Sequence, residues 1–357
     1  MQPPRAFTRV PLALLIALAA CLLGGCTPGT FLAHRILRAP NSYPDWIAPD
    51  ARVLLDFQTN VVMGLPRHAF QAPASPILPG DPARLAYRIV PPAAYRPVVL
   101  ASNWTHRGRP MSEFTFTRQV PAPPIDGLQQ PLGTVVLLHG YGLSQGSMLP
   151  WAFLCADLGW HSILVDLRGH GRSTGRRVSF GPAEVADLDA LLGHLDTAQS
   201  LPRPIVVLGV SFGGSLALRW VAQNPALDSA IAIAPYPRLA PAIERIRDDF
   251  APGVPRFIVR AAAAAIPGIL GLHPSDLDPV ANLNPRPPMA LLMASDHDVI
   301  APPRDVEQLQ LGCAGGSRLH VVAGPTHEQL PFQLASLAPV IKPWLASRSP
   351  SATPRAP

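Results

Sequence analysis

The chain has few charged residues, few aromatic residues and few cysteines. Of its 357 residues, 15% are charged, 6% are aromatic and four are cysteine. So few cysteines exclude a small scaffold held together by disulfides. A hydrophobic fraction of 48% excludes a chain that is disordered throughout. The length suits one large domain or two small ones, with enough apolar residues to form a core.

Basic residues exceed acidic ones, but they do not gather in one place. The formal net charge is +6, and the densest basic group, which is Arg168, Arg172, Arg176 and Arg177, lies in a turn-rich stretch. A nucleic-acid-binding surface would concentrate such residues in a patch or stripe. We therefore expect no nucleic-acid partner. The sequence does not indicate an oligomeric state.

The first 25 residues have the pattern of a secretion signal. Residues 1–9 carry Arg5 and Arg9 and no acidic residue, and an apolar run follows from Val10 to Leu23. That run is short for a permanent span of a hydrocarbon core of about 30 Å. Because a basic start before a short apolar stretch is typical of export signals, we expect the protein to be exported.

The end of this segment resembles the lipobox of bacterial lipoproteins. The sequence LGGC at 23–26 fits that pattern, and LAAC at 18–21 fits it as well. Cys26 is favoured over Cys21 as the lipidation site, because the polar, turn-forming Thr27-Pro28-Gly29 follows it. The resemblance implies a palmitate-carrying mature protein that is anchored to a membrane, at the periplasmic face of a bacterial outer membrane. The alternatives are an ordinary cleaved signal and an uncleaved anchor.

Two cysteines, Cys155 and Cys313, remain in the mature chain. Cys155 lies in an expected helix and Cys313 in a glycine-rich turn. Although export would permit a disulfide, we expect two separately buried thiols.

The chain changes character near residue 131. Residues 26–130 are rich in proline and predict a tether and a strand-rich extension, with strands at 85–90, 98–103 and 113–118. Residues 131–346 alternate short apolar strands with helices, which predicts a mostly parallel sheet covered on both faces, an α/β fold. Residues 347–357 predict a disordered tail. The expected strands are 134–138, 162–166, 205–208, 230–234, 289–294 and 319–322, and the expected helices are 145–158, 182–198, 212–224 and 328–345.

The sequence GVSFG at 209–213 follows one apolar strand and begins a helix. This is the context that a G-x-S-x-G nucleophile elbow requires, because Ser211 must sit in a strained turn with small neighbours at Gly209 and Gly213. A phosphate-binding turn is the alternative. It would call for a G-x-G-x-x-G spacing or a lysine, and this segment has neither.

A second motif, HGYG at 139–142, ends an earlier strand. Acyl transfer requires two N–H groups directed at the developing oxyanion. We expect these donors to be the backbone amides of Phe212 and Tyr141. His139 itself is expected to be structural.

Together, HGYG, DLRGHGRS at 166–173 and GVSFGG at 209–214 resemble the α/β-hydrolase superfamily, in particular its serine esterases, monoacylglycerol lipases and lysophospholipases. The resemblance covers about residues 131–345. It implies an α/β-hydrolase fold, a catalytic triad in the order Ser, Asp or Glu, His, and no cofactor. Asp166 and His170 belong to a structural turn in this comparison.

The resemblance selects the remaining triad members from the ends of late strands. The family pattern after 289–294 selects Asp298 as the acid, with Asp296 as the alternative, and Ser295 stands where glycine is usual. After 319–322, the family's Gly-x-x-His-Glu ending selects His327, with Pro325 where glycine is commoner. No histidine or cysteine spacing indicates a metal site.

The sequence therefore predicts an exported serine hydrolase that acts on a small or lipid-like acyl ester through Ser211, His327 and Asp298. A thioesterase or an aminopeptidase-like amidase would use the same triad, and a binding lipoprotein without turnover is a further alternative. Residues 236–288 lie where the family inserts a cap. They are interpreted either as a lid over an acyl pocket or as an ordinary crossover helix.

Overall fold

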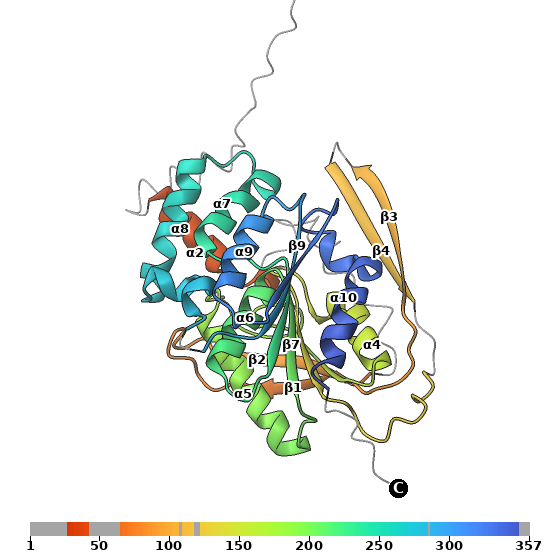
Figure 1. Cartoon of the computed structure of the whole chain (residues 1–357). Coiled ribbons are helices and arrows are strands. Elements are labelled where there is room, and N and C mark those ends of the chain that lie inside the picture. Colours follow the sequence, from red (N-terminus) through yellow and green to blue (C-terminus); the bar gives the residue numbers. More distant parts are fainter. Residues whose placement is uncertain (1–26, 43–64, 107–108, 118–121, 285, 350–357) are drawn as a thin grey trace, which may run out of the picture.

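A computed structural model describes residues 27–42, 65–106, 109–117, 122–284 and 286–349 (Figure 1). The predicted signal segment, both candidate lipidation cysteines and most of the predicted tail lie outside these residues. In the described part of the chain, no helix is both long enough and apolar enough to cross a bilayer. Cys155 is buried and Cys313 is partly buried, and neither forms a disulfide.

The centre of the molecule is an eight-stranded sheet in the order β1-β2-β6-β5-β7-β8-β9-β10. Neighbouring strands from β6 through β5, β7, β8 and β9 to β10 are parallel. At the other end of the sheet, β2 is antiparallel to β6, and β1 is antiparallel to β2. The central strands are buried along their whole length, which explains their continuous apolar sequences. The bounds are β1 His68–Gln71, β2 Arg84–Val90, β5 Thr134–Leu138, β6 His161–Val165, β7 Ile205–Val210, β8 Ser229–Ile233, β9 Ala290–Ser295 and β10 Arg318–Val322.

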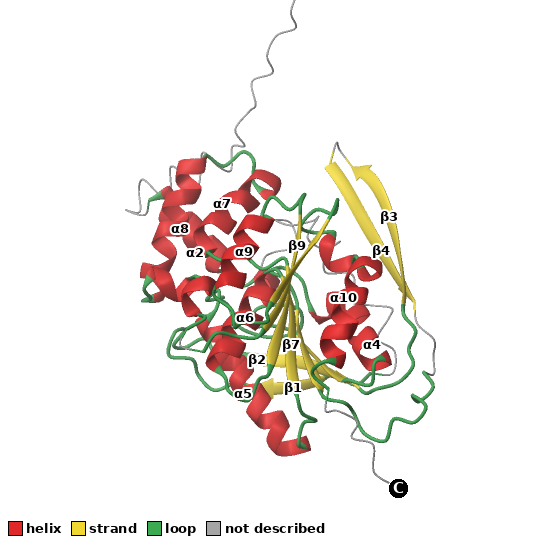
Figure 2. Cartoon of the chain, viewed as in Figure 1, coloured by secondary structure: helices red, strands yellow, loops and turns green. Residues whose placement is uncertain are grey.

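Helices cover both faces of this sheet (Figure 2). One face packs against α4 and α10 and the other against α5, α6 and α9, so two apolar clusters form, one on each side. The bounds are α4 Leu149–Asp157, α5 Pro182–Gln199, α6 Phe212–Gln223, α9 Pro303–Leu311 and α10 Leu334–Ala346. The predicted α/β architecture is therefore present.

Two helix bounds differ from the sequence prediction for local reasons. The segment predicted as a helix from residue 145 begins with a 3-10 turn, η3 (Gln145–Met148), before α4. The last helix begins at Leu334 and not at residue 328, because the 3-10 turn η6 (Leu330–Phe332), which contains Pro331, precedes it.

The proline-rich extension contains more regular structure than expected. Strands β3 (Val98–His106) and β4 (Arg109–Thr117) include residues 98–103 and 113–117 of the predicted strands, but they pair with each other, antiparallel, in a separate two-stranded sheet. An unexpected helix, α2 (Pro28–Leu37), begins directly after Thr27, whose side chain accepts a hydrogen bond from the amide of Thr30. Tertiary packing stabilises α2, because Gly29 lies so close to α8 that an added Cβ would be 2.6 Å from Ala261 Cβ.

The predicted cap region lies between β8 and β9. It contains two helices, α7 (Leu239–Phe250) and α8 (Arg256–Leu270), and two 3-10 turns, η4 (Pro274–Leu277) and η5 (Pro279–Asn282). Helices α7 and α8 pack on each other and, with α2, lie outside the α6 side of the sheet (Figure 1).

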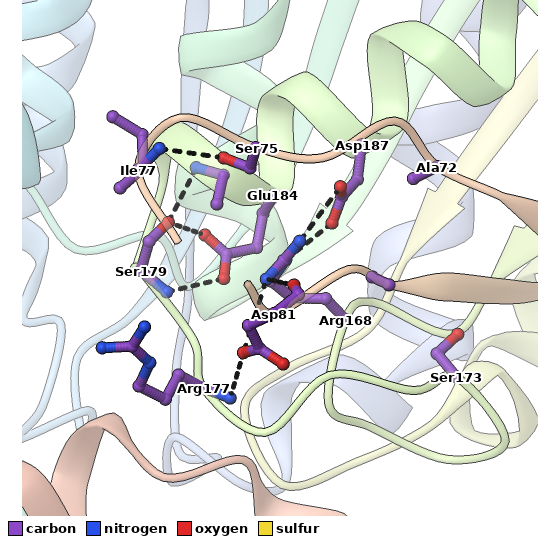
Figure 3. Close-up of polar contacts among 12 residues, drawn as sticks. Ala72, Ser75, Ile77, Asp81, Arg168, Ser173, Arg177, Ser179, Glu184 and Asp187 are labelled. Atoms are coloured by element: carbon purple, nitrogen blue, oxygen red, sulfur yellow. Dashed lines mark hydrogen bonds and ion pairs between the residues drawn. The ribbon is translucent and has the colours of Figure 1, made fainter. Parts of the chain in front are cut away.

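A buried charge cluster fastens the turn after β6 to α5 and to the N-terminal extension (Figure 3). The Arg168 side chain is fully buried, and its Nε lies 2.7 Å from Asp187 Oδ2. Its Nη1 donates to the carbonyl of Asp81 at 3.3 Å. The Asp81 carboxylate in turn accepts the backbone N–H groups of Arg176 and Arg177. Burial raises the pKa of Asp187 to about 6, so this carboxylate depends on Arg168 for its charged state.

We expect Arg168→Met to be strongly destabilising, because it leaves the buried carboxylate of Asp187 without its cation. Removing one member of a buried pair typically costs about 3–5 kcal/mol. The matched control is Arg203→Met, since Arg203 pairs with Asp196 at the surface, where such pairs contribute about 0–1 kcal/mol. Urea unfolding midpoints provide the comparison. Equal losses in the two variants would contradict this account of the cluster.

Candidate active site

Ser211 occupies a strained turn between β7 and α6. Its φ is 50° and its ψ is −114°, a conformation that L-residues rarely adopt. The Ser211 N–H donates to the carbonyl of Ile233 at 2.7 Å, which ties the turn to the neighbouring strand β8. The strain is therefore held in place by the sheet itself.

Gly209 and Gly213 make this turn sterically possible. A Cβ added to Gly209 would lie 2.0 Å from the carbonyl oxygen of Gly213, and one added to Gly213 would lie 2.3 Å from that of Leu138. Both contacts are with backbone atoms, which cannot move aside as a flexible side chain can. The prediction that Ser211 needs small residues on each side is thus confirmed, because backbone atoms occupy the space that a side chain at residue 209 or 213 would need.

The structure brings Ser211, His327 and Asp298 together. His327 Nε2 lies 2.8 Å from Ser211 Oγ, and His327 Nδ1 lies 2.7 Å from Asp298 Oδ2. The three residues follow β7, β10 and β9, respectively. Because these strands are parallel, their carboxyl ends meet at one edge of the sheet, which explains how residues 116 positions apart come into contact.

Asp298 and Asp296 occupy different environments. Asp298 is buried, and its other carboxylate oxygen accepts the N–H groups of Ile300 and Ala301 at 2.8 and 2.7 Å. Asp296 is exposed and accepts the Gly324 N–H at 2.8 Å, a bond that holds the pKa of Asp296 below its usual value. The carboxylate in contact with His327 is that of Asp298, the residue that the family pattern selects.

Ser295 contributes to the site in a way that the sequence analysis does not anticipate. Its hydroxyl donates to the carbonyl of Pro325 and accepts the N–H of His297 at 3.2 Å. This side chain joins the loop that carries Asp298 to the loop that carries His327. The signal in the sequence is the departure from glycine at this position.

Two backbone segments lie beside Ser211. Helix α6 begins at Phe212, so the Phe212 N–H is in the first turn, where amides have no carbonyl partner within the helix. Gly140, in the loop after β5, lies next to Ser211. A Cβ added to Gly140 would be 3.7 Å from Ser211 Cβ. These segments carry the two amides predicted to form an oxyanion hole.

His139 fixes the orientation of the peptide between Gly140 and Tyr141. The Gly140 carbonyl accepts the Leu143 N–H at 3.1 Å and a hydrogen bond from His139 Nδ1 at 2.8 Å. In a trans peptide the following N–H points opposite to the carbonyl. The Tyr141 N–H is therefore directed away from both of these donors.

His139 also connects this loop to the turn after β6. Its Nε2 accepts the Leu167 N–H at 3.0 Å, so the ring must be neutral, with its proton on Nδ1. Complete burial lowers the pKa of His139 to about 4, which favours this form at neutral pH. His139 is thus a positioning residue, whereas the sequence indicates only a structural role.

Aromatic rings surround the outer side of this loop. The Tyr141 ring stacks on Phe180 with centroids 5.5 Å apart and meets His170 edge-on at 5.4 Å. The Tyr141 hydroxyl donates to the carbonyl of Ile36 in α2 at 3.2 Å. His170 is buried, its Nδ1 donates to the carbonyl of Arg168, and burial lowers its pKa to about 3. Asp166 accepts the Gln145 amide at 2.7 Å, so it braces the far end of the same loop.

Within the described part of the chain, no group of three or more histidine, cysteine, aspartate or glutamate side chains is placed to hold a metal ion.

Comparisons with known proteins show similarity to hydrolases. A family model described as serine aminopeptidase, S33, matches residues 129–284. The chain is 33% identical to a monoacylglycerol lipase of Mycolicibacterium smegmatis over 136 residues, which are 35% of this chain and 48% of that protein. It is 28% identical to a phospholipase of Bacillus subtilis over 108 residues, 30% of this chain and 41% of that protein. The matches thus cover less than half the length of these curated relatives.

Solved structures show the same fold. An esterase from Pyrococcus furiosus superposes with a TM-score of 0.56 at 14% identity, covering 88% of this chain and 98% of that one. An α/β hydrolase from a Penicillium species gives a TM-score of 0.52 at 16% identity, covering 80% and 99%. The chain therefore has the α/β-hydrolase fold that the sequence predicts.

Because the buried histidines are neutral in the folded protein, the free energy of unfolding should decrease as the pH is lowered. Between pH 6.5 and about 4 the unfolded chain takes up a proton at His139 that the folded chain does not, so stability decreases as the pH falls. One such group gives a slope of up to about 1.4 kcal/mol per pH unit. Urea unfolding of His139→Gln at several pH values should therefore show a shallower decline than wild type. His34→Gln, on the exposed face of α2, should retain the wild-type slope. Identical slopes in all three proteins would contradict a neutral His139.

Proposed function

We propose that the chain is a serine hydrolase that cleaves carboxylic esters through an acyl-enzyme on Ser211. One observation carries the proposal, namely the continuous hydrogen-bonded path from Ser211 Oγ through the imidazole of His327 to Asp298, at 2.8 and 2.7 Å. A serine in a strained turn beside an oriented imidazole is the arrangement that activates a hydroxyl nucleophile.

In the first half of the reaction, His327 acts as the base. With the Asp298 carboxylate ionised, His327 Nδ1 carries a proton and Nε2 is free to take the proton of Ser211. Ser211 Oγ then forms a bond to the substrate carbonyl carbon, while Asp298 stabilises the imidazolium. The resulting oxyanion accepts hydrogen bonds from the amides of Phe212 and Tyr141.

In the second half, His327 acts first as an acid and then again as a base. The tetrahedral intermediate collapses as the carbon–oxygen bond of the ester breaks, and the leaving alcohol receives the proton from His327 Nε2. A water molecule then gives its proton to the same nitrogen and attacks the acyl-enzyme. The bond between the acyl carbon and Ser211 Oγ then breaks, His327 Nε2 returns its proton to Oγ, and the carboxylic acid leaves.

The favoured substrates are small or lipid-like acyl esters. The names of the relatives, a monoacylglycerol lipase, a phospholipase and a structurally similar esterase, support this class. Apolar residues of α8, such as Val259 and Ile266, belong to the large apolar cluster on the side of the sheet that also holds Phe212. The cap is therefore proposed to take part in forming the acyl site.

A thioesterase or an aminopeptidase-like amidase remains the alternative. The matching family model is described as serine aminopeptidase, which favours the amide form of this alternative. The ester, thioester and amide reactions differ only in the leaving group. His327 would protonate each of these leaving groups in the same way, so the triad alone does not distinguish the three reactions. A binding protein without turnover is less well supported, because it would not require a hydrogen-bonded Ser211, His327 and Asp298.

Purified protein should therefore hydrolyse a p-nitrophenyl acyl ester faster than the matched acyl thioester or p-nitroanilide. Values of kcat/KM for the three substrates, across acyl chains from two to sixteen carbons, make the comparison. A preference for the thioester or the anilide would replace the ester proposal with the corresponding alternative.

Two neighbouring aspartates provide a matched test of the triad. Asp298→Asn should lower kcat by about 10⁴-fold, because the imidazole loses the acceptor that sets its tautomer. Asp296→Asn should change kcat only a few-fold, since asparagine can still accept the Gly324 N–H. The reverse pattern would show that Asp296 is the acid.

A further inference from the structure

One side chain of the cap reaches the loop that carries Asp298. Arg245 lies on α7, and its Nη1 donates to the carbonyl oxygen of Ile300 at 2.8 Å and to the carboxylate of Asp305. Ile300 follows Asp298 by two residues in the loop between β9 and α9, and Asp305 is in the first turn of α9. A single guanidinium nitrogen therefore joins the cap to this loop.

The Ile300 carbonyl and the Ala301 N–H belong to the same peptide group. The Ala301 N–H donates to Asp298 Oδ1 at 2.7 Å. In a trans peptide the carbonyl and the N–H point in opposite directions, so this group lies between the Arg245 cation and the Asp298 carboxylate. Hydrogen bonds arranged in series polarise one another, so the contact with Arg245 strengthens the bond from Ala301 to Asp298.

This peptide group helps to set the orientation of the Asp298 carboxylate. Oδ1 of Asp298 accepts the N–H groups of Ile300 and Ala301, and Oδ2 lies 2.7 Å from His327 Nδ1. The carboxylate is planar and buried, so the direction in which Oδ2 faces His327 depends on the donors that hold Oδ1. A hydrogen-bonded path thus runs from Arg245 to the imidazole.

The contact made by Arg245 is shielded from solvent. The Arg245 side chain is 27% exposed and that of Asp305 is 10% exposed. By contrast, the ion pair between Arg260 and Glu244, also in the cap, has side chains that are 66% and 33% exposed. Water and salt screen such exposed pairs, so their contribution is small. The Arg245 contact is the better candidate for a role beyond the surface.

We propose that Arg245 is a positioning residue for the reaction, which holds the 300–301 peptide and through it the carboxylate of Asp298. The inference rests on the proposed function, because the orientation of Asp298 affects a rate only if His327 activates Ser211. The cap then contributes to the chemical step itself, and not only to the acyl site.

The first test separates kcat from KM for a p-nitrophenyl acyl ester. Arg245→Met should lower kcat about tenfold and change KM by less than about twofold, because the lost contact orients the triad and is not made to the substrate. Arg245→Lys should recover most of the lost kcat. Both bonds of Arg245 come from one nitrogen, and a single ammonium group has enough donors to replace them.

Further variants separate this role from a purely structural one. Arg245→Met leaves the largely buried Asp305 carboxylate without this cation, which is destabilising. The double variant Arg245→Met/Asp305→Asn removes both charges and should show the same loss of kcat. Asp305→Asn alone should keep kcat within about twofold of wild type, because asparagine still accepts a bond from Arg245.

The matched control is Arg238→Met. Arg238 is exposed, directly precedes α7 and donates to Gln308 of α9 at 2.6 Å, so it also joins the cap to α9 but does not contact the 298–301 loop. This variant should retain the wild-type kcat. An unchanged kcat in Arg245→Met, or equal losses in the Arg245 and Arg238 variants, would overturn the proposal.

A second readout does not require turnover. Long-range ¹H–¹⁵N spectra of histidine-labelled protein report the tautomer of His327, which is assigned by comparison with His327→Gln. The Asp298→Asn variant gives the reference for an imidazole without its carboxylate acceptor. Arg245→Met should move the His327 signals toward this reference, whereas Arg238→Met should leave them unchanged.

The two readouts distinguish failure of this inference from failure of the proposed function. His327 signals that stay at their wild-type positions in Arg245→Met would overturn the positioning role, whether or not the chain hydrolyses esters. Signals that move in a protein without esterase, thioesterase or amidase turnover would support the link from Arg245 to Asp298 and contradict the proposed function alone.

Discussion

The candidate site depends on one steric constraint, the positive φ of Ser211 in the turn between β7 and α6. That conformation exists only because Gly209 and Gly213 allow backbone atoms to approach at distances that no Cβ would permit. The sheet supplies the energy that holds the turn, through the bond from the Ser211 amide to β8. Ser211 is held at the carboxyl ends of the parallel strands, and the loops that follow β9 and β10 lie beside it. Asp298 and His327 therefore need only be the right residue types in those two loops.

A second layer of buried polar groups holds the backbone around that turn. His139, neutral and fully buried, orients the peptide before Tyr141 and connects it to the turn after β6. Arg168 fastens that turn to α5, while Asp166 secures the other end of the 140–145 loop. In the described part of the chain these groups form no hydrogen bond with the triad, yet they hold the loop whose amides face Ser211.

The sequence predicted what depends on local pattern and missed what depends on tertiary contact. The parallel strands are visible because strands buried on both faces must be continuously apolar. Ser211 follows from the strand–turn–helix context of its motif, whereas Asp298 and His327 are what the resemblance to the α/β-hydrolase superfamily implies. Helix α2 was missed because its stability comes from the approach of Gly29 to Ala261, more than 200 residues away. The positioning role of His139 was missed because its acceptor bond to Leu167 depends on how β5 and β6 pair. At Ser295 the sequence shows only a departure from the family pattern, because the contact with the His327 loop depends on the tertiary structure.

The central claim is that this constrained turn makes Ser211 a reactive nucleophile. The most direct measurement is labelling of the folded protein with a fluorophosphonate probe, followed by intact mass and peptide mapping. The account predicts one adduct per chain, located on Ser211, and no adduct in a folded Ser211→Ala variant. Absence of labelling in the folded wild-type protein, or an adduct that persists in Ser211→Ala, would contradict it.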